Sequence, residues 1–126
     1  MTIAYDDQNI FAKILRGEIP SEPIAETEHS LAFRDIRPQA PVHVLVIPKG
    51  AYVTYADFAQ DASEAEIVDF TRLVGQLAEE LDLIPTPGGG GHRLISNAGA
   101  DAHQEVPHMH IHLLGGRALG GLLPAQ

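Results

Sequence analysis

The chain has 126 residues, of which 44% are hydrophobic and 20% charged, a balance typical of one globular domain and not of a disordered chain. It has no cysteine, which excludes disulfides, thiolate metal sites and a cysteine nucleophile. The formal net charge of −9 repels a polyanionic duplex, so we expect no nucleic-acid partner.

The sequence predicts neither a secretory signal nor a membrane span. Its first residues lack the apolar run of a secretory signal, and no later segment approaches about 18 apolar residues, so we expect no membrane partner. We expect a cytoplasmic protein with a single domain over residues 1–126.

The N-terminal segment predicts a short helix. Residues 10–15 place apolar side chains on one helical face, with Asn9 as a cap and Gly17 beyond the end.

The rest of the chain predicts five strands and one long helix. Ser63 and Glu66 have the spacing of a capping box, and apolar residues then recur at helical spacing to about residue 82. The four glycines at 88–91 lack the strand, helix and lysine of a phosphate loop, which favours a plain connection. Short apolar runs predict strands at 23–27, 30–34, 42–47, 92–97 and 108–114.

These elements predict an α+β fold. The connections are short enough for antiparallel pairing, which gives a five-stranded antiparallel sheet. One long helix covers one face of that sheet, and one short helix completes the fold.

Three of the seven histidines alternate with apolar residues in the segment 108–114. Alternate side chains of a strand share a face, so His108, His110 and His112 are expected to point one way. Neighbouring imidazoles would lie about 6.6–6.8 Å apart, which suits a phosphate or a metal ion. Three buried imidazoles need partners for six ring nitrogens, which argues against a purely structural array.

A metal site is an alternative for these histidines. Alternating strand histidines serve as zinc ligands, and His43 or His103 would supply a fourth. Metal-bound histidines need supporting carboxylates, and Glu105 is the only one close in the sequence. We therefore expect neither a metal nor another cofactor.

The segment 108–114 matches the signature of the histidine-triad (HIT) superfamily, in which three histidines alternate with apolar residues. Segments 10–21, 33–36, 38–43, 104–106 and 115–117 resemble its Hint branch, the purine nucleoside phosphoramidases, and above all the bacterial members. The similarity extends from about residue 8 to residue 117. It implies a homodimer that acts on a purine nucleotide.

The resemblance implies cleavage of nucleoside 5′-phosphoramidates, adenosine first among them, through a nucleotidyl-histidine intermediate. His110 would be the nucleophile, held in its reactive tautomer by the carbonyl of His108, and His112 would pass a proton to the departing amine. His43 and His108 would donate hydrogen bonds to the phosphate. Glu105 stands where animal members have a serine that helps to protonate the leaving group, so it joins the catalytic candidates.

The resemblance also implies a nucleoside pocket. Asp35 would accept hydrogen bonds from the ribose hydroxyls, and Asn97 would contact the ribose or the phosphate. Gln104 and Val106 would frame the nucleotide beside the triad. The apolar side chains expected to enclose the base are Ile10, Phe11, Ile14, Phe33 and Ile36.

Two other functions stay open on the same scaffold. Dinucleoside polyphosphate hydrolases and nucleotidyl transferases usually carry glutamine between or near the triad histidines, where this chain has Met109 and Ile111. A nucleotide-binding adaptor with weak catalysis would not need all three histidines. The phosphoramidate hydrolase is therefore the preferred interpretation.

Overall fold

The N-terminal helix begins where the sequence predicts, in a computed structural model that describes residues 3–124. Helix α1 (Ile10–Leu15) is capped by Asn9, whose side-chain oxygen accepts a hydrogen bond from the Ala12 N–H at 2.9 Å. This bond satisfies one of the amide groups that a helix start leaves without a partner. The helix buries Phe11 and Ala12.

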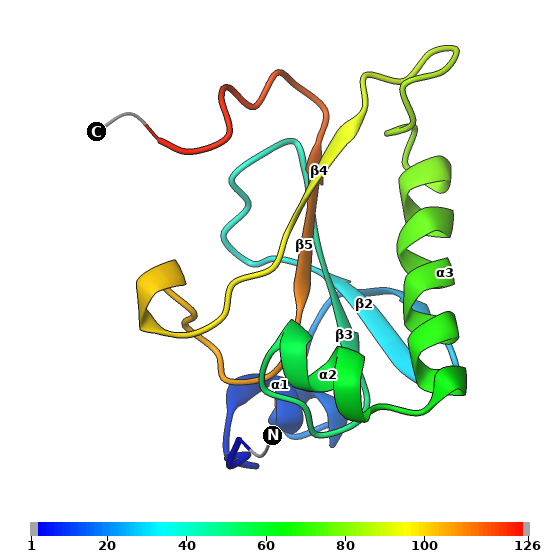
Figure 1. Cartoon of the computed structure of the whole chain (residues 1–126). Coiled ribbons are helices and arrows are strands. Elements are labelled where there is room, and N and C mark those ends of the chain that lie inside the picture. The colour runs from blue at the N-terminus through cyan, green and yellow to red at the C-terminus, as the bar shows by residue number, and fades with distance from the viewer. Residues whose placement is uncertain (1–2, 125–126) are drawn as a thin grey trace.

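Five strands form one antiparallel sheet in the order β1-β2-β3-β5-β4 (Figure 1). The first two pair as the predicted hairpin, and β3 pairs with both β2 and β5. The sheet confirms the predicted α+β fold with five antiparallel strands. The strands are β1 (Pro23–Glu26), β2 (Ser30–Arg34), β3 (Val42–Pro48), β4 (His92–Ile95) and β5 (Ile111–Gly115).

The long helix α3 (Glu64–Glu80) lies across one face of the sheet, as predicted, and packs against β2 and β3 (Figure 1). Ser63 and Glu66 form the expected capping box at its start. Its buried face includes Phe70 and Leu77, which join Val44 of β3 in the main core. Periodicity over many turns makes a helix of this length readable from the sequence.

The structure has a second short helix, α2 (Tyr55–Asp61), where the sequence analysis expects only one. Thr54 and Asp57 form a capping box at its start, and Phe58 on this helix is buried against Phe70. Seven residues are too few to show a clear period of 3.6. The spacing of Thr54 and Asp57 was the available signal.

The last strand is shorter than predicted, because β5 begins at Ile111 and not at His108. The backbone groups of the preceding residues bond elsewhere. The Met109 N–H donates to the Tyr52 carbonyl at 2.7 Å, and the His108 carbonyl accepts from the His110 ring. Met109 still packs in the core beneath α3 with Leu113, so the alternation of side chains continues ahead of the strand.

The opposite face of the sheet carries α1 and a smaller apolar cluster. Phe11 packs there against Phe33 and Leu45, with Ile47 and Leu31 beside them. Because Leu45 lies opposite His112 in the β3–β5 register, His112 shares this face. Within residues 3–124, no helix is long and apolar enough to cross a membrane.

Candidate active site

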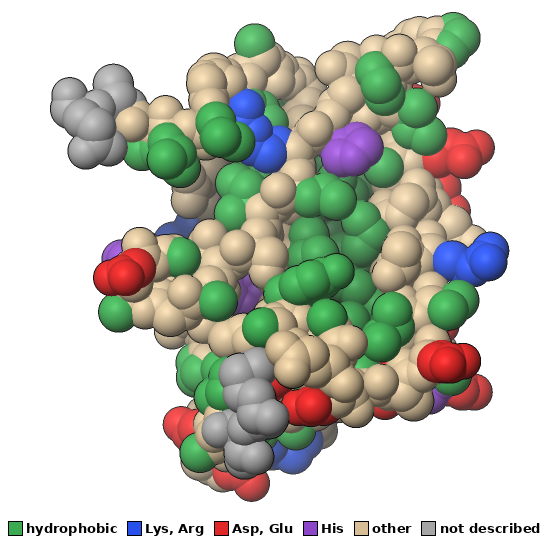
Figure 2. All heavy atoms as spheres, viewed as in Figure 1, with side chains coloured by type: hydrophobic (Ala, Val, Ile, Leu, Met, Phe, Trp, Pro, Cys, Tyr) green, Lys and Arg blue, Asp and Glu red, His purple; other side chains and the backbone are tan. Residues whose placement is uncertain are grey.

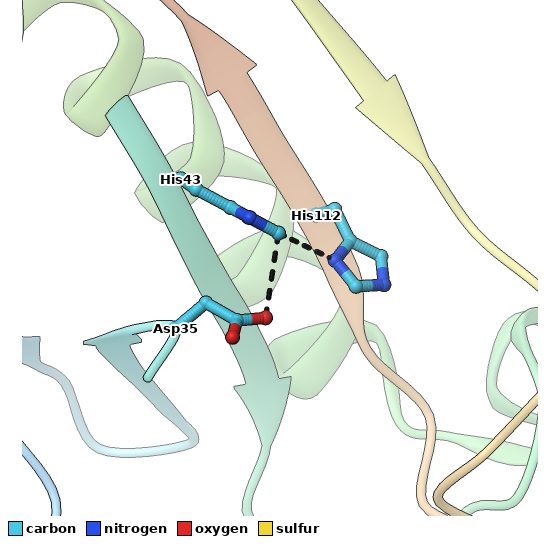
Figure 3. A group of neighbouring side chains, drawn as sticks. All are labelled: Asp35, His43 and His112. Carbon is cyan, nitrogen blue, oxygen red and sulfur yellow. Dashed lines mark hydrogen bonds and ion pairs between the residues drawn. The ribbon is translucent and has the colours of Figure 1, made fainter. Parts of the chain in front are cut away.

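Three histidine rings form a contiguous row on the face of the sheet that carries α1. The ring centroids of His43 and His112 lie 5.2 Å apart, and those of His112 and His110 lie 5.1 Å apart. His43 comes from β3, His112 from β5, and His110 from the residue just before β5. Asp35, which follows β2, points its carboxylate at His43 (Figure 3). The fold thus brings together four polar groups from three separate segments.

Hydrogen-bond partners fix the tautomers of His43 and His112. The backbone N–H of Gln39 donates to Nδ1 of His43 at 3.0 Å, so the proton of that ring sits on Nε2. Nε2 of His43 lies 2.9 Å from Nδ1 of His112 and 3.4 Å from Oδ2 of Asp35 (Figure 3). His43 therefore donates to His112, and the neutral ring of His112 carries its proton on Nε2.

His110 is held in the opposite tautomer. Its Nδ1 lies 2.6 Å from the carbonyl oxygen of His108, which can only accept, so the proton sits on Nδ1. This is the contact that the sequence analysis expects. The unprotonated Nε2 has a free electron pair, and the ring is buried beside Phe11, edge to face at 5.0 Å. An imidazole in this state is chemically a nucleophile.

His108 differs from its expected place beside a phosphate. Its side chain is 0% exposed, and both of its ring nitrogens are engaged. Nε2 lies 2.8 Å from the carbonyl oxygen of Pro48, and Nδ1 lies 2.6 Å from the hydroxyl of Tyr5. Since the chain turns this ring into the protein, His108 has no N–H to offer a bound anion, and its role must differ from that of a phosphate donor.

Burial lowers the pKa of all four histidines below the ordinary value. For His108 and His110 burial dominates over the backbone carbonyls that favour the protonated ring. For His43 burial outweighs the attraction of Asp35. For His112 burial and repulsion from His110 and His43 lower the pKa to about 4. Near neutral pH the row is therefore uncharged, and Nε2 of His110 keeps its electron pair.

Asp35, His43 and His112 bring ligand atoms within 4.8 Å of one another, close enough to test against a metal ion. A metal on Nε2 of His43 would force the ring proton onto Nδ1. That nitrogen faces the N–H of Gln39, so two donors would meet. Histidine ligands need an acceptor at this second nitrogen. The hydrogen bonding of His43 suits a proton donor and does not suit a metal ligand.

The apolar residues expected around the base lie in two groups. Phe11 and Phe33 are buried and pack edge to face at 5.5 Å, with Ile14 against them. Ile10 and Ile36 are exposed, Ile36 to 86%. The two exposed isoleucines leave apolar side chains open to solvent, one next to Phe11 and the other three residues after Phe33 in the sequence.

The segment before the triad is anchored by Gln104. Its side-chain amide donates to the carbonyls of Val53 and Val106 at 2.7 and 3.1 Å and accepts from the N–H of Gly99 at 3.0 Å. Val106 packs on the apolar cluster beneath α1. Gln104 and Val106 thus have structural contacts, in addition to their expected place at the nucleotide.

Glu105 and Asn97 lie at the margin of the site. Glu105 is exposed and pairs with the equally exposed His103 at 2.9 Å. Its negative charge still favours the protonated form of His112 and so opposes the lowering of that pKa. Asn97 is half-buried and is the second residue after the end of β4. Neither residue belongs to the row of imidazoles itself.

Sequence reasoning missed the groups that hold the histidines. Tyr5, the carbonyl of Pro48 and the N–H of Gln39 set the protonation of the rings. Two of these three are backbone groups, which every residue except proline supplies in full. Only Tyr5 contributes a side chain, which the sequence does show. The residues around Tyr5 in the sequence do not link it to the triad.

The chain is similar to known proteins along most of its length. Residues 16–119 match the family described as HIT domain. A HIT-like protein of Azospirillum brasilense is 54% identical over 98% of both chains. The purine nucleoside phosphoramidase of Escherichia coli K12 is 39% identical over 93% of this chain and 94% of its own.

Solved structures agree. A histidine triad protein of Clostridium difficile superposes with a TM-score of 0.77 at 39% identity, covering 90% of this chain and 95% of that one. A HIT family hydrolase of Legionella pneumophila has a TM-score of 0.75 at 41% identity over 88% and 95% of the two chains. The fold of this chain thus occurs in solved structures of a histidine triad protein and a HIT family hydrolase.

Proposed function

This chain belongs to the HIT domain family, and from that premise we propose that it hydrolyses the P–N bond of nucleoside 5′-phosphoramidates, with adenosine as the preferred nucleoside. A general role as a HIT hydrolase follows from its relatives. The observation that supports the chemistry is the pair formed by His110 and His112. One ring offers an unprotonated Nε2, and its neighbour offers an Nε2–H.

In the first step, Nε2 of His110 attacks the α-phosphorus and the P–N bond breaks. The amine needs a proton to leave, and His112 supplies it from Nε2. The negative charge of a bound phosphate raises the pKa of His112 from its value of about 4, so that ring gains a proton on Nδ1 and enters the step as an imidazolium, and the Nε2–H of His43 turns from His112 to the phosphate. The products are the free amine and a nucleotide bonded to His110.

In the second step, water attacks the phosphorus of the adduct. His112, now neutral, takes the proton of that water, and the bond to His110 breaks. The nucleoside monophosphate leaves, and both histidines return to their starting states. A displacement of the amine by imidazole and a displacement of imidazole by water replace one difficult displacement, which is the advantage of covalent catalysis.

The surrounding groups have supporting roles in this proposal. In the free protein His43 keeps the proton of His112 on Nε2, and once His112 is protonated on both nitrogens the Nε2–H of His43 is released to bind the phosphate. Asp35 accepts from the ribose hydroxyls, and Asn97 and Glu105 contact the phosphate end. Phe11 and Phe33, with Ile14, form the wall against which the base packs. Ile10 and Ile36 close over its other side.

We also propose that the active form is a homodimer. β4 is an edge strand, and Leu94 on it is 46% exposed. Val68 on α3 is 48% exposed. Figure 2 shows a hollow lined with hydrophobic side chains between the strands and α3. A second copy of the chain would pair with the open strand edge and cover this apolar surface.

Rapid quenching followed by intact-mass measurement tests the hydrolase. With adenosine 5′-phosphoramidate, the protein should gain the mass of one adenylyl group within the first turnover. His110→Ala should show no adduct and no turnover while it still binds adenosine monophosphate. His29→Ala, at the turn between β1 and β2, is the matched control and should behave as the wild type.

Three results contradict the proposal. Turnover near the wild-type rate in His110→Ala removes the nucleophile from the mechanism. Faster cleavage of diadenosine polyphosphate than of the phosphoramidate assigns the site to the other branch of the family. Nucleotide binding by the wild type without product over hours leaves only a binding protein.

A further inference from the structure

The ring of His108 is held at both nitrogens by groups far from it in the sequence. Its Nε2 lies 2.8 Å from the carbonyl oxygen of Pro48, at the end of β3. Its Nδ1 lies 2.6 Å from the hydroxyl of Tyr5, which precedes α1. The Tyr5 ring stands edge to face with the imidazole at 5.6 Å. The N-terminal segment thus contacts the residue whose carbonyl holds the ring of His110.

The chemistry of these two partners allows only one protonation state of the His108 ring. A carbonyl oxygen cannot donate, so Nε2 of His108 carries a proton. A proton on Nδ1 as well would place a cation in a fully buried position, where desolvation lowers the pKa of the ring. Nδ1 is therefore an acceptor, and the Tyr5 hydroxyl is the donor. Burial raises the pKa of Tyr5, so its hydroxyl keeps the proton near neutral pH.

The backbone of His108 is directly tied to the nucleophile. Its carbonyl oxygen accepts from Nδ1 of His110 at 2.6 Å, the bond that leaves Nε2 of His110 unprotonated. On the other side of this peptide, the N–H of Met109 donates to the carbonyl of Tyr52. A rotation of the His108 residue would carry its carbonyl with it and turn the ring of His110.

We propose that Tyr5 is a positioning residue for the nucleophile, acting through His108. Its hydroxyl completes the bonding of the His108 ring, and the fixed ring holds the carbonyl that orients His110. The kinetic part of this inference rests on the proposed hydrolase activity. The structural part, a hydrogen bond that orders a buried imidazole, stands apart from any substrate.

Tyr5→Phe is the sharp test because it removes one oxygen and keeps the ring that packs on His108. The matched control is Tyr55→Phe, which makes the same change at a half-exposed tyrosine on α2. Each protein is labelled with ¹⁵N at its histidines, and the ring nitrogen shifts are recorded by NMR. Initial rates with adenosine 5′-phosphoramidate give kcat and KM for the same samples.

In the wild type, His108 should show a protonated Nε2 and a hydrogen-bonded, unprotonated Nδ1. In Tyr5→Phe, the Nδ1 signal of His108 should move toward that of a free electron pair. We expect kcat to fall about tenfold, as when an outer partner of a functional histidine is lost, and KM to stay within about twofold. Tyr55→Phe should change neither the shifts nor the rates.

Two outcomes overturn the inference. An unchanged Nδ1 shift in Tyr5→Phe shows that the hydroxyl does not bond to His108. A changed shift with wild-type kcat shows that the bond orders His108 without positioning the nucleophile. If the wild type itself cleaves no phosphoramidate, the proposed function fails, and the shifts still decide whether Tyr5 orders the His108 ring.

Discussion

Nε2 of His43 and Nδ1 of His112 lie 2.9 Å apart, although 69 positions separate the two residues in the chain. The antiparallel pairing of β3 with β5 produces this contact, because Leu45 lies opposite His112 and His43 is the next residue on the same face. The sheet register therefore determines which nitrogen of His112 carries the proton. That nitrogen is the one the proposed mechanism uses.

Replacing His43 should weaken catalysis through His112. His43→Ala removes the donor that keeps the proton of His112 on Nε2 and removes one donor to the phosphate, so we expect kcat to fall about 10²-fold. His43→Gln retains an N–H donor on a shorter reach and should recover part of the loss. Steady-state rates of both variants, with His29→Gln as the control, measure the effect. If kcat of His43→Ala stays within twofold of the wild type, the contact between His43 and His112 does not contribute to catalysis.

A charge on the exposed edge of the sheet should break the proposed dimer. Leu94→Glu places a carboxylate on β4 in apolar surface, where desolvation opposes burial of the charge. Size-exclusion chromatography with light scattering should give twice the chain mass for the wild type and the single-chain mass for the variant. Leu122→Glu adds the same charge at a side chain that is 87% exposed and should remain dimeric. A wild-type monomer at micromolar concentration contradicts the assignment.

The lowered pKa values of the buried histidines make stability depend on pH. In the unfolded chain these rings titrate near 6.5, and in the folded protein they titrate lower, His112 at about 4. Between these values the unfolded state binds more protons, so the free energy of unfolding falls as the pH drops from about 6.5 toward 4. Above about 6.5 this contribution to stability is fully present.

Urea unfolding at a series of pH values from 7.5 to 4.5 measures this dependence. His112→Gln should show a shallower decline than the wild type, because one buried group no longer gains a proton on unfolding. His103→Gln changes an exposed histidine and should follow the wild-type curve. A wild-type stability that stays constant below pH 6.5 would mean that the site histidines are solvated in the folded protein.

The sequence predicts those parts of the fold whose signal repeats over several residues. Helix α3 can be predicted from its periodicity, and β3 can be predicted from its run of β-branched residues. Helix α2 is too short to show a period. The start of β5 was misplaced because side-chain alternation continues through Met109, where the backbone bonds to Tyr52 instead of to a strand. Periodicity reports the direction of side chains and not the partners of the backbone.

The candidate site, like the fold, could be predicted from the sequence only in part. The triad pattern marks the candidate histidines, but the alternation alone suggests that His108 and His110 are equivalent. The structure separates them, since one ring is closed off by Tyr5 and Pro48 and the other keeps a free nitrogen. This difference depends on contacts across long sequence distances, which no local pattern contains.

The acceptor that fixes the tautomer of His110, the proposed nucleophile, is a main-chain oxygen, and this affects how the site tolerates mutation. Every amino acid supplies that oxygen, so no codon change at position 108 deletes it. Substitutions at position 108 should lower the reaction rate to different extents, because they change how firmly this peptide is held. Substitutions at position 110 remove the imidazole nitrogen that we propose attacks the phosphorus. A saturation library would then show a continuum of rates at one position and an all-or-nothing profile two residues later.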